Sequence, residues 1–125
     1  MKTNRISILF VVFLIMTFAL AFMAMGCGKA SLVFSPNLLP QAALGQPYQT
    51  IVKISENSTP VGSMTIDSGT LPSGLTLQFN KGTDSALISG TPSQSGSFKF
   101  TLGAWCMGTN SPGQSGSQVY VLIVN

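Results

Sequence analysis

The chain has 125 residues, no histidine, two cysteines, and only six basic and three acidic side chains. The length allows one small domain beside a leader segment. Without histidine no Ser-His or Cys-His pair can form, and so few basic residues make no patch for nucleic acid.

The first 27 residues are an apolar segment with a basic start. Lys2 and Arg5 precede an almost unbroken apolar run over residues 6–25, which ends at Gly26 and Cys27. A basic start, an apolar middle and a small-residue end are typical of an export signal. We therefore expect the part of the chain after this segment to lie outside the cytoplasm.

The junction Ala24-Met25-Gly26-Cys27 resembles the lipobox of bacterial lipoprotein precursors. The resemblance implies cleavage between Gly26 and Cys27, and a diacylglyceryl group on the Cys27 thiol. Ala24 departs from the family, which usually has Leu three residues before the cysteine. The alternative is an uncleaved anchor helix, since residues 6–25 span roughly 30 Å as a helix, enough for a hydrocarbon core.

After the signal, the charge and composition change. Four Lys face three acids, so the formal net charge falls from +3 to +1. The boundaries predicted here are a lipoprotein signal peptide over 1–26, a lipidated N-terminus and short tether over 27–36, and a folded domain over 37–125.

The rest of the chain predicts short strands separated by Gly and Pro. The sequence favours an all-β fold, an antiparallel β-sandwich of about seven strands, with a closed barrel as the competitor. Residues 119–124 are apolar on both faces, which predicts a strand covered on both sides or paired centrally. The expected strands cover 31–34, 48–54, 63–66, 75–79, 86–88, 97–102 and 119–124.

Three motifs occur in order: Gly-Thr-Leu-Pro-Ser-Gly-Leu-Thr-Leu at 69–77, Ile-Ser-Gly-Thr-Pro at 88–92, and Gly-Ser-Phe at 96–98. Together they resemble the immunoglobulin-like repeat of bacterial surface proteins (He-PIG type), over roughly 37–125. The resemblance implies a cadherin-like sandwich that serves as a spacer or adhesion module. Pro72 is predicted at the second position of a turn, and Gly74 at a position with positive φ.

Few residues suggest chemistry. Glu56, Asp67 and Asp84 are predicted to be solvated loop charges, with no motif that links them. Cys106 stands where cadherin-like repeats often carry an aspartate, which makes a calcium site doubtful, and no cofactor is expected. The thiol of Cys106 is interpreted as half-buried beside Trp105; an intermolecular disulfide is the functional alternative.

The candidate contact residues lie near Trp105. This single tryptophan is expected to cover one end of the core, or alternatively to anchor a ligand. A long polar loop is predicted over 107–117, and long loops on a rigid sandwich often carry function. Trp105, Met107 and Asn110 are therefore the candidate contacts with a partner.

The sequence as a whole predicts a lipid-anchored cell-envelope protein that is not an enzyme. It would bind membrane lipid through Cys27, and an envelope or surface protein or glycan through its domain. The outer membrane is favoured if the cell has two membranes, because Gly28 is not an aspartate-type retention signal. The alternatives are a structural accessory subunit of an envelope assembly, or a single-pass anchored domain without lipidation.

Overall fold

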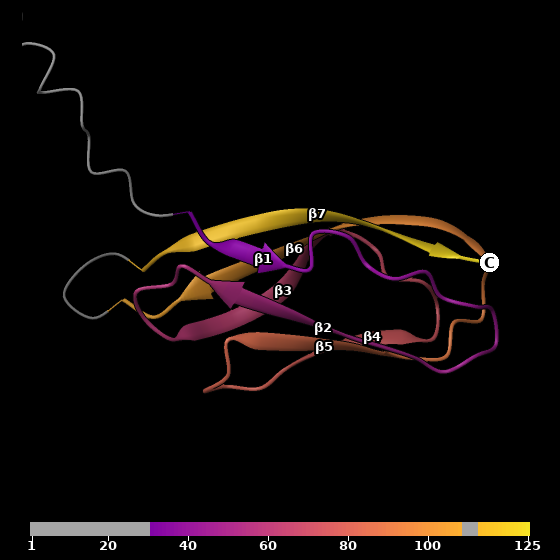
Figure 1. Ribbon diagram of the computed structural model, residues 1–125, viewed down its shortest axis with the longest axis horizontal. Helices are drawn as coiled ribbons and strands as arrows, with labels where there is room; N and C mark the ends of the chain where they lie inside the picture. The colour runs from indigo at the N-terminus through magenta and orange to yellow at the C-terminus, as the bar shows by residue number, and fades with distance from the viewer. Residues whose placement is uncertain (1–30, 109–112) are drawn as a thin grey trace, which may run out of the picture.

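The computed structural model describes residues 31–108 and 113–125 as an all-β domain (Figure 1). The predicted signal or anchor segment, Gly26, Cys27 and Asn110 lie outside the described residues. All seven predicted strands are present. They are β1 (Val33–Ser35), β2 (Tyr48–Ser55), β3 (Val61–Gly69), β4 (Leu75–Phe79), β5 (Ser85–Gly90), β6 (Gly96–Cys106) and β7 (Ser115–Val124).

The strands form two sheets that face each other, as a sandwich requires. One sheet has the order β1-β2-β5-β4 and the other β3-β6-β7, and all paired strands are antiparallel. Short loops at both ends carry the chain between the sheets (Figure 1). The sandwich prediction is confirmed, and the described residues do not close into the competing barrel.

The sandwich starts before residue 37, the domain boundary expected from the sequence. Leu32 and Phe34 are 6% and 3% exposed, and β1 pairs with the end of β2. A chain that buries these side chains gains apolar burial that a free tether would lack. The folded domain therefore includes residues that the sequence assigned to the tether.

The core lies between the sheets and is made by alternate residues of the strands. Tyr48, Val52 and Ile54 face inward from β2, as their spacing predicted. Phe100 and Leu102 do so from β6, with Phe98 partly buried beside them. The buried cluster contains no charged or polar side chain among the described residues.

β7 differs from its prediction. It is an edge strand that pairs with β6, and among the described residues its other edge is paired at an isolated parallel bridge from Ala42 to Val124. Tyr120 and Leu122 are buried, whereas Val121 between them is 48% exposed. The run over 119–124 is thus apolar on both faces but covered on one. The predicted two-sided cover is wrong, since apolar residues also occupy exposed strand positions for their β-propensity.

The motif around Pro72 makes a turn in a different frame from the one predicted. The Leu75 N–H donates to the Pro72 carbonyl (3.1 Å), so Pro72 occupies the first position and Gly74 the third. Gly74 has φ +93°, the left-handed backbone that its place in the motif predicted. Pro72 is fully buried and serves as a packing residue rather than presetting φ for the second position.

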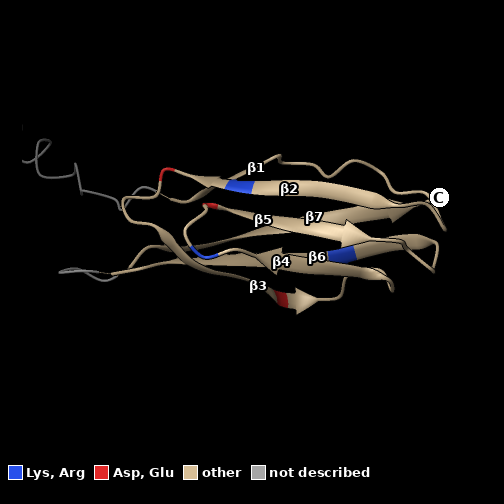
Figure 2. Cartoon of the chain, turned by 90° about the horizontal axis from the view of Figure 1, so that it is seen from below, with Lys and Arg blue, Asp and Glu red and all other residues tan. Residues whose placement is uncertain are grey.

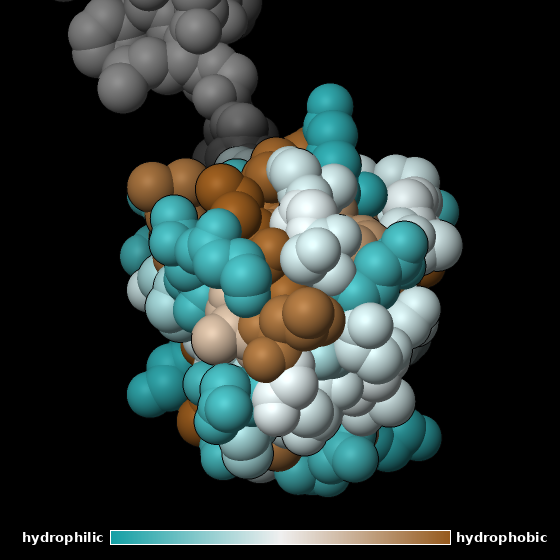
Figure 3. All heavy atoms as spheres, turned by 90° about the vertical axis from the view of Figure 1, so that its right-hand side faces the viewer, coloured by the Kyte–Doolittle hydropathy of each residue, from teal (hydrophilic) through white to brown (hydrophobic). Residues whose placement is uncertain are grey.

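Charges are spread over the strands and loops instead of gathering on one face (Figure 2). The end of the sandwich that carries the C-terminus shows apolar patches broken by hydrophilic side chains (Figure 3). Leu44 lies at this end, where its N–H donates to the Asn125 carbonyl (2.7 Å). Within residues 31–108 and 113–125, no helix has the length and apolarity to cross a membrane.

Candidate functional site

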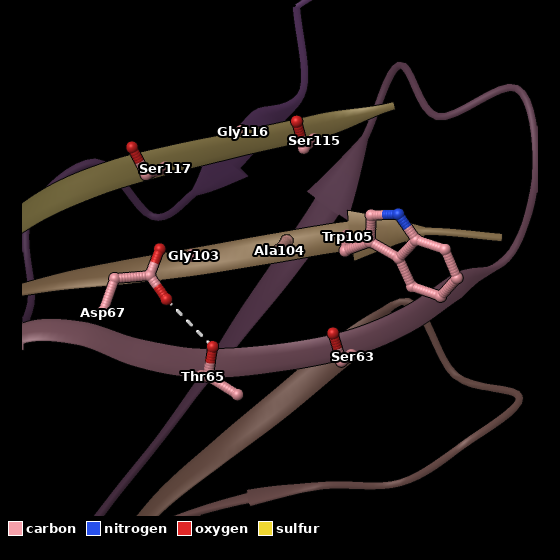
Figure 4. A pocket seen from close by; sticks show the side chains of 9 residues that line it. All are labelled: Ser63, Thr65, Asp67, Gly103, Ala104, Trp105, Ser115, Gly116 and Ser117. Carbon is pink, nitrogen blue, oxygen red and sulfur yellow. Dashed lines mark hydrogen bonds between the residues drawn. The ribbon is translucent and has the colours of Figure 1, made fainter. Parts of the chain in front are cut away.

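The outer face of the β3-β6-β7 sheet carries a hollow of about 330 Å³ (Figure 4). It opens on the side of the sheet that points away from the core. We call it the outer hollow. Its lining residues come from all three strands and are Ser63, Thr65, Asp67, Gly103, Ala104, Trp105, Ser115, Gly116 and Ser117.

Cross-strand register places the lining in two rows. Trp105 of β6 lies between Ser63 of β3 and Ser115 of β7 in one row. Gly103 lies between Thr65 and Ser117 in the next. Gly103 has no side chain, so no side chain of β6 projects between Thr65 and Ser117 in the second row.

Two bulges in β3 shape the ends of the outer hollow. Gly62 is the extra residue between the pairs Val61–Cys106 and Ser63–Trp105. Asp67 is the extra residue between the pairs made by Ile66 and Ser68. A bulge bends a strand locally and re-aims a side chain, and bulges recur beside functional sites.

Asp67 folds over Gly103, so that a Cβ at residue 103 would collide with its carboxylate. The Thr65 hydroxyl donates to Asp67 Oδ1 (2.9 Å), which orients the carboxylate (Figure 4). Asp67 is exposed and lies in a strand, whereas the sequence placed it in a loop. It therefore presents an accessible negative charge at one end of the outer hollow.

Trp105 forms the opposite end. Its indole lies against the backbone of Gly62, where a Cβ would be 2.5 Å from Cζ3 and 2.7 Å from Cε3. The side chain is 49% exposed, so it does not cover the core as the sequence favoured. It fits the alternative prediction of an exposed aromatic residue available to a ligand.

Cys106 points the other way, into the core. It is 0% exposed, not half-buried, and burial raises the pKa of its thiol, with a smaller contribution from the negative charge of Asp84. A neutral, inaccessible thiol cannot attack another chain while the domain stays folded. The alternative prediction of an intermolecular disulfide does not fit this structure.

Asp84 is an exposed loop residue, as predicted, and its carboxylate also makes structural hydrogen bonds. It accepts hydrogen bonds from the Val61 N–H (3.1 Å) and the Asn57 side chain (3.0 Å). Both hydrogen bonds lower the pKa of Asp84, and the one from Val61 contributes most. The carboxylate therefore ties the start of β3 to the start of β5. Glu56, with φ 62°, lies exposed in the turn after β2.

The loop after β6 is shorter than predicted, because Ser115 and Ser117 already belong to β7. Gln114 precedes them, and its side chain bonds the Ser58 N–H (2.6 Å) and the Glu56 carbonyl (3.2 Å). Met107 is 38% exposed and its Cγ lies close to Gly62, so it borders the indole. Of the predicted contacts, Trp105 and Met107 thus lie together.

The remaining lining residues were missed by sequence reasoning. Small and polar side chains alternate outward in β3 and at the start of β7, next to Trp105, and that pattern was the available signal. Within the described ranges, no three His, Cys, Asp or Glu side chains gather as a metal site would need. The outer hollow therefore offers one carboxylate, several hydroxyls and one aromatic surface, a set that suits binding.

This architecture agrees with the family comparison. The family described as "Putative Ig domain" matches residues 30–125. The chain belongs to this family. Its Ig-like fold is the one that the three motifs implied, and it is a fold typical of non-catalytic modules. A comparison with curated proteins finds no match.

Solved structures share the Ig-like fold at low sequence identity. MfFcnA9, an endo-fucoidan hydrolase from glycoside hydrolase family 107, is 24% identical, with 78% of this chain and 17% of that chain covered (TM-score 0.57). MfFcnA4 of the same family is 20% identical over 81% and 15% (TM-score 0.52). A variant of the SrpA adhesin from Streptococcus sanguinis is 12% identical over 78% and 56% (TM-score 0.56).

Coverage limits what these similarities mean. The chain spans less than a fifth of the two hydrolases and little more than half of the adhesin chain. The similarity is therefore one of fold in a part of each larger protein. It assigns no substrate to the Ig-like domain described here.

Proposed function

We propose that the chain is an exported lipoprotein whose Ig-like domain binds a partner at the bacterial envelope without catalysing a reaction. The proposed export and lipidation rest on the signal-like segment and the lipobox-like junction at Cys27. The outer membrane is the preferred site in a cell with two membranes. The partner is an envelope or surface protein or glycan.

One observation carries the binding role: Trp105 is half-exposed beside a carboxylate and hydroxyls in the outer hollow. Tryptophan is enriched where proteins hold their partners, because its large rigid surface loses little entropy on binding. A soluble domain gains nothing in stability by leaving that surface open to water. A partner that binds here would cover the exposed side chain of Trp105.

The same hollow argues against hydrolysis. Glycoside hydrolases generally use two carboxyl groups that flank the scissile bond. Of the described lining residues only Asp67 carries a carboxyl group, and the chain has no histidine to replace the second. This supports a binding module despite the hydrolase matches.

Signal cleavage and lipidation are tested by intact-mass analysis of protein extracted from membranes. We expect the mass to show loss of residues 1–26 and addition of acyl chains. Cys27→Ala should abolish both changes, while Cys106→Ala, which removes the chain's other thiol, should retain them. An unmodified mass near 13.1 kDa in the membrane fraction would instead establish the uncleaved anchor.

The binding role is tested by a photo-crosslinking residue placed at Met107 in living cells. Met107 borders the indole and is 38% exposed, and Ile51, which is exposed on the other sheet at 48%, provides the control position. We expect a covalent adduct at position 107 and none at position 51. Equal labelling at both positions, or none at either, would indicate a structural accessory without a binding face.

A further inference from the structure

The indole of Trp105 forms a flat platform on the sheet. Its inner face lies on Gly62, the extra residue of a bulge, where any side chain would displace the ring. Figure 4 shows the indole broadside on the outer face of the sheet. An aromatic face carries partial negative charge and attracts the partially positive C–H groups of a ring laid upon it.

The polar side chains of the outer hollow are of a complementary kind. Ser63, Thr65, Ser115 and Ser117 each carry a hydroxyl, which both donates and accepts hydrogen bonds. Asp67 adds a pure acceptor that forms the strong, charge-assisted type of bond. A polyhydroxylated ligand can satisfy all of these groups at once.

The size of the outer hollow fits a short saccharide. Trp105 and Gly103 point outward from β6 two residues apart, which corresponds to about 6.6 Å along a strand. Asp67 lies over Gly103 whereas the indole lies on Gly62, so the carboxylate and the indole occupy opposite ends of the outer hollow. The volume of about 330 Å³ is at the small end of ligand sites, which run from about 300 to 1,000 Å³.

We propose that the outer hollow is a binding site for a short neutral saccharide, in which one sugar ring stacks on Trp105 and a neighbouring ring donates a hydroxyl hydrogen bond to Asp67. This deepens the proposed function, on which it rests, by naming the class of partner. The ligand is neutral because Asp67 is the charged residue among those described in the lining, and it would repel an anionic sugar.

A quaternary ammonium group is a poorer fit. Such cations are held by cages of several aromatic side chains, whereas the described lining contributes one. They also form no hydrogen bonds, which would leave the surrounding hydroxyls unused.

The test uses the intrinsic fluorescence of Trp105, which is the only tryptophan in the chain and therefore reports on this site alone. The full-length protein is extracted in a detergent without a sugar head group. It is titrated with maltotriose, cellotriose and triacetylchitotriose. We expect a saturable change in emission with at least one of these trisaccharides.

Asp67→Asn is the decisive variant, because it removes the charge and keeps the shape and the tryptophan. We expect it to weaken binding about tenfold, the loss typical of a charge-assisted hydrogen bond. Glu56→Gln removes another exposed carboxylate and should leave the affinity unchanged. Calorimetry on Trp105→Ala should show no binding, with Ile51→Ala as the matched control.

The outcomes separate the site from the general function. No saturable response to any of the three trisaccharides, or equal affinity in Asp67→Asn, would overturn the saccharide site. A saturable response to tetramethylammonium alone would assign the site to cations instead. A protein adduct at position 107 together with no saccharide response would overturn this inference and leave the proposed function standing. A cytosolic, unlipidated chain that still binds trisaccharide would overturn the proposed function and leave the saccharide site standing.

Discussion

Tyr120 shows how one buried side chain links the two ends of the described chain. It is 1% exposed in β7, and its ring lies 6.0 Å from that of Phe100, between centroids. Its hydroxyl donates to the Pro36 carbonyl (2.8 Å), which joins β7 to the segment just after β1. Burial raises the pKa of Tyr120 to about 12, because the phenolate would lose its hydration.

This pKa predicts a loss of stability in alkali. An unfolded tyrosine releases its proton near pH 10, whereas the folded one keeps it up to about 12. The stabilisation is therefore complete below about pH 10 and is lost as the pH rises through about 12. We expect the urea midpoint to fall between about pH 9 and about pH 11, and to fall less in Tyr120→Phe.

Tyr48→Phe is the control for that experiment. The pKa of Tyr48 is also raised by burial, and its hydroxyl donates to the Pro40 carbonyl (2.9 Å). Because Tyr120 is intact in this variant, the part of the fall in urea midpoint that Tyr120 causes should remain. An identical fall of the midpoint in wild type and Tyr120→Phe would contradict the assignment.

Single residues also mark where sequence reasoning stops. Trp105 stood out because it is unique, but Asp67 did not, since its role depends on a bulge. Hydrophobic alternation indicates which residues face the core and carries no information about an extra residue on the outer side. The partnership of Asp67 with Gly103 arises from strand pairing, between positions far apart in the sequence.

At the scale of elements, the junction between β4 and β5 explains the paired motifs. A Cβ at Gly74 would collide with the Thr91 carbonyl, and a Cβ at Gly90 would collide with the Gly74 carbonyl. The Thr91 N–H donates to Gly74 O (3.2 Å), and the Ser93 N–H donates to Ser73 O (2.9 Å). The two glycines are needed because two backbones meet there without room for side chains.

Gly74→Ala and Gly82→Ala form a matched pair that tests this contact. Both positions have similar φ, +93° and +89°, but nothing lies within 4 Å of a Cβ at Gly82. Gly82→Ala should cost about 1 kcal/mol of unfolding free energy, from backbone strain alone. Gly74→Ala should cost at least about 2 kcal/mol more, because the backbones must separate. Equal midpoints in urea would show that the close approach contributes nothing.

Strand existence was predictable and strand ends were not. Each strand contains a stretch whose side chains alternate or are β-prone, and that is a local property. The extensions of β6 to Cys106 and of β7 from Ser115 run through glycine, alanine and serine, which give no hydrophobic periodicity. Their pairing with each other sets these limits.

At the scale of the whole molecule, stability comes from one core between two sheets. Adjacent residues of β7 show this, since Leu122 is 0% and Val121 is 48% exposed. The sequence alone could not distinguish them, because both are apolar and strand-forming. The packing of the β3-β6-β7 sheet against the other sheet decides which side is covered, because Leu122 points into the core between them.

We therefore expect opposite results from two neighbouring substitutions. Leu122→Ala should lower the free energy of unfolding by about 3 kcal/mol, because it leaves a cavity in the core. Val121→Ala should change it by about 0.5 kcal/mol, as surface positions usually do. Urea denaturation of both variants measures the difference. Similar losses would mean that another part of the protein covers the outer side of β7.

The position of Leu32 bears on which end of the domain would lie near a membrane. Its side chain packs behind Gly116, so the described chain begins at the end of the sandwich that holds Trp105. Five peptide units separate Cys27 from Leu32, a reach of at most about 18 Å. If Cys27 carries lipid, the end of the sandwich that holds Trp105 is kept close to the bilayer. Ligands would then be sampled from what coats the membrane itself, not from the surrounding medium.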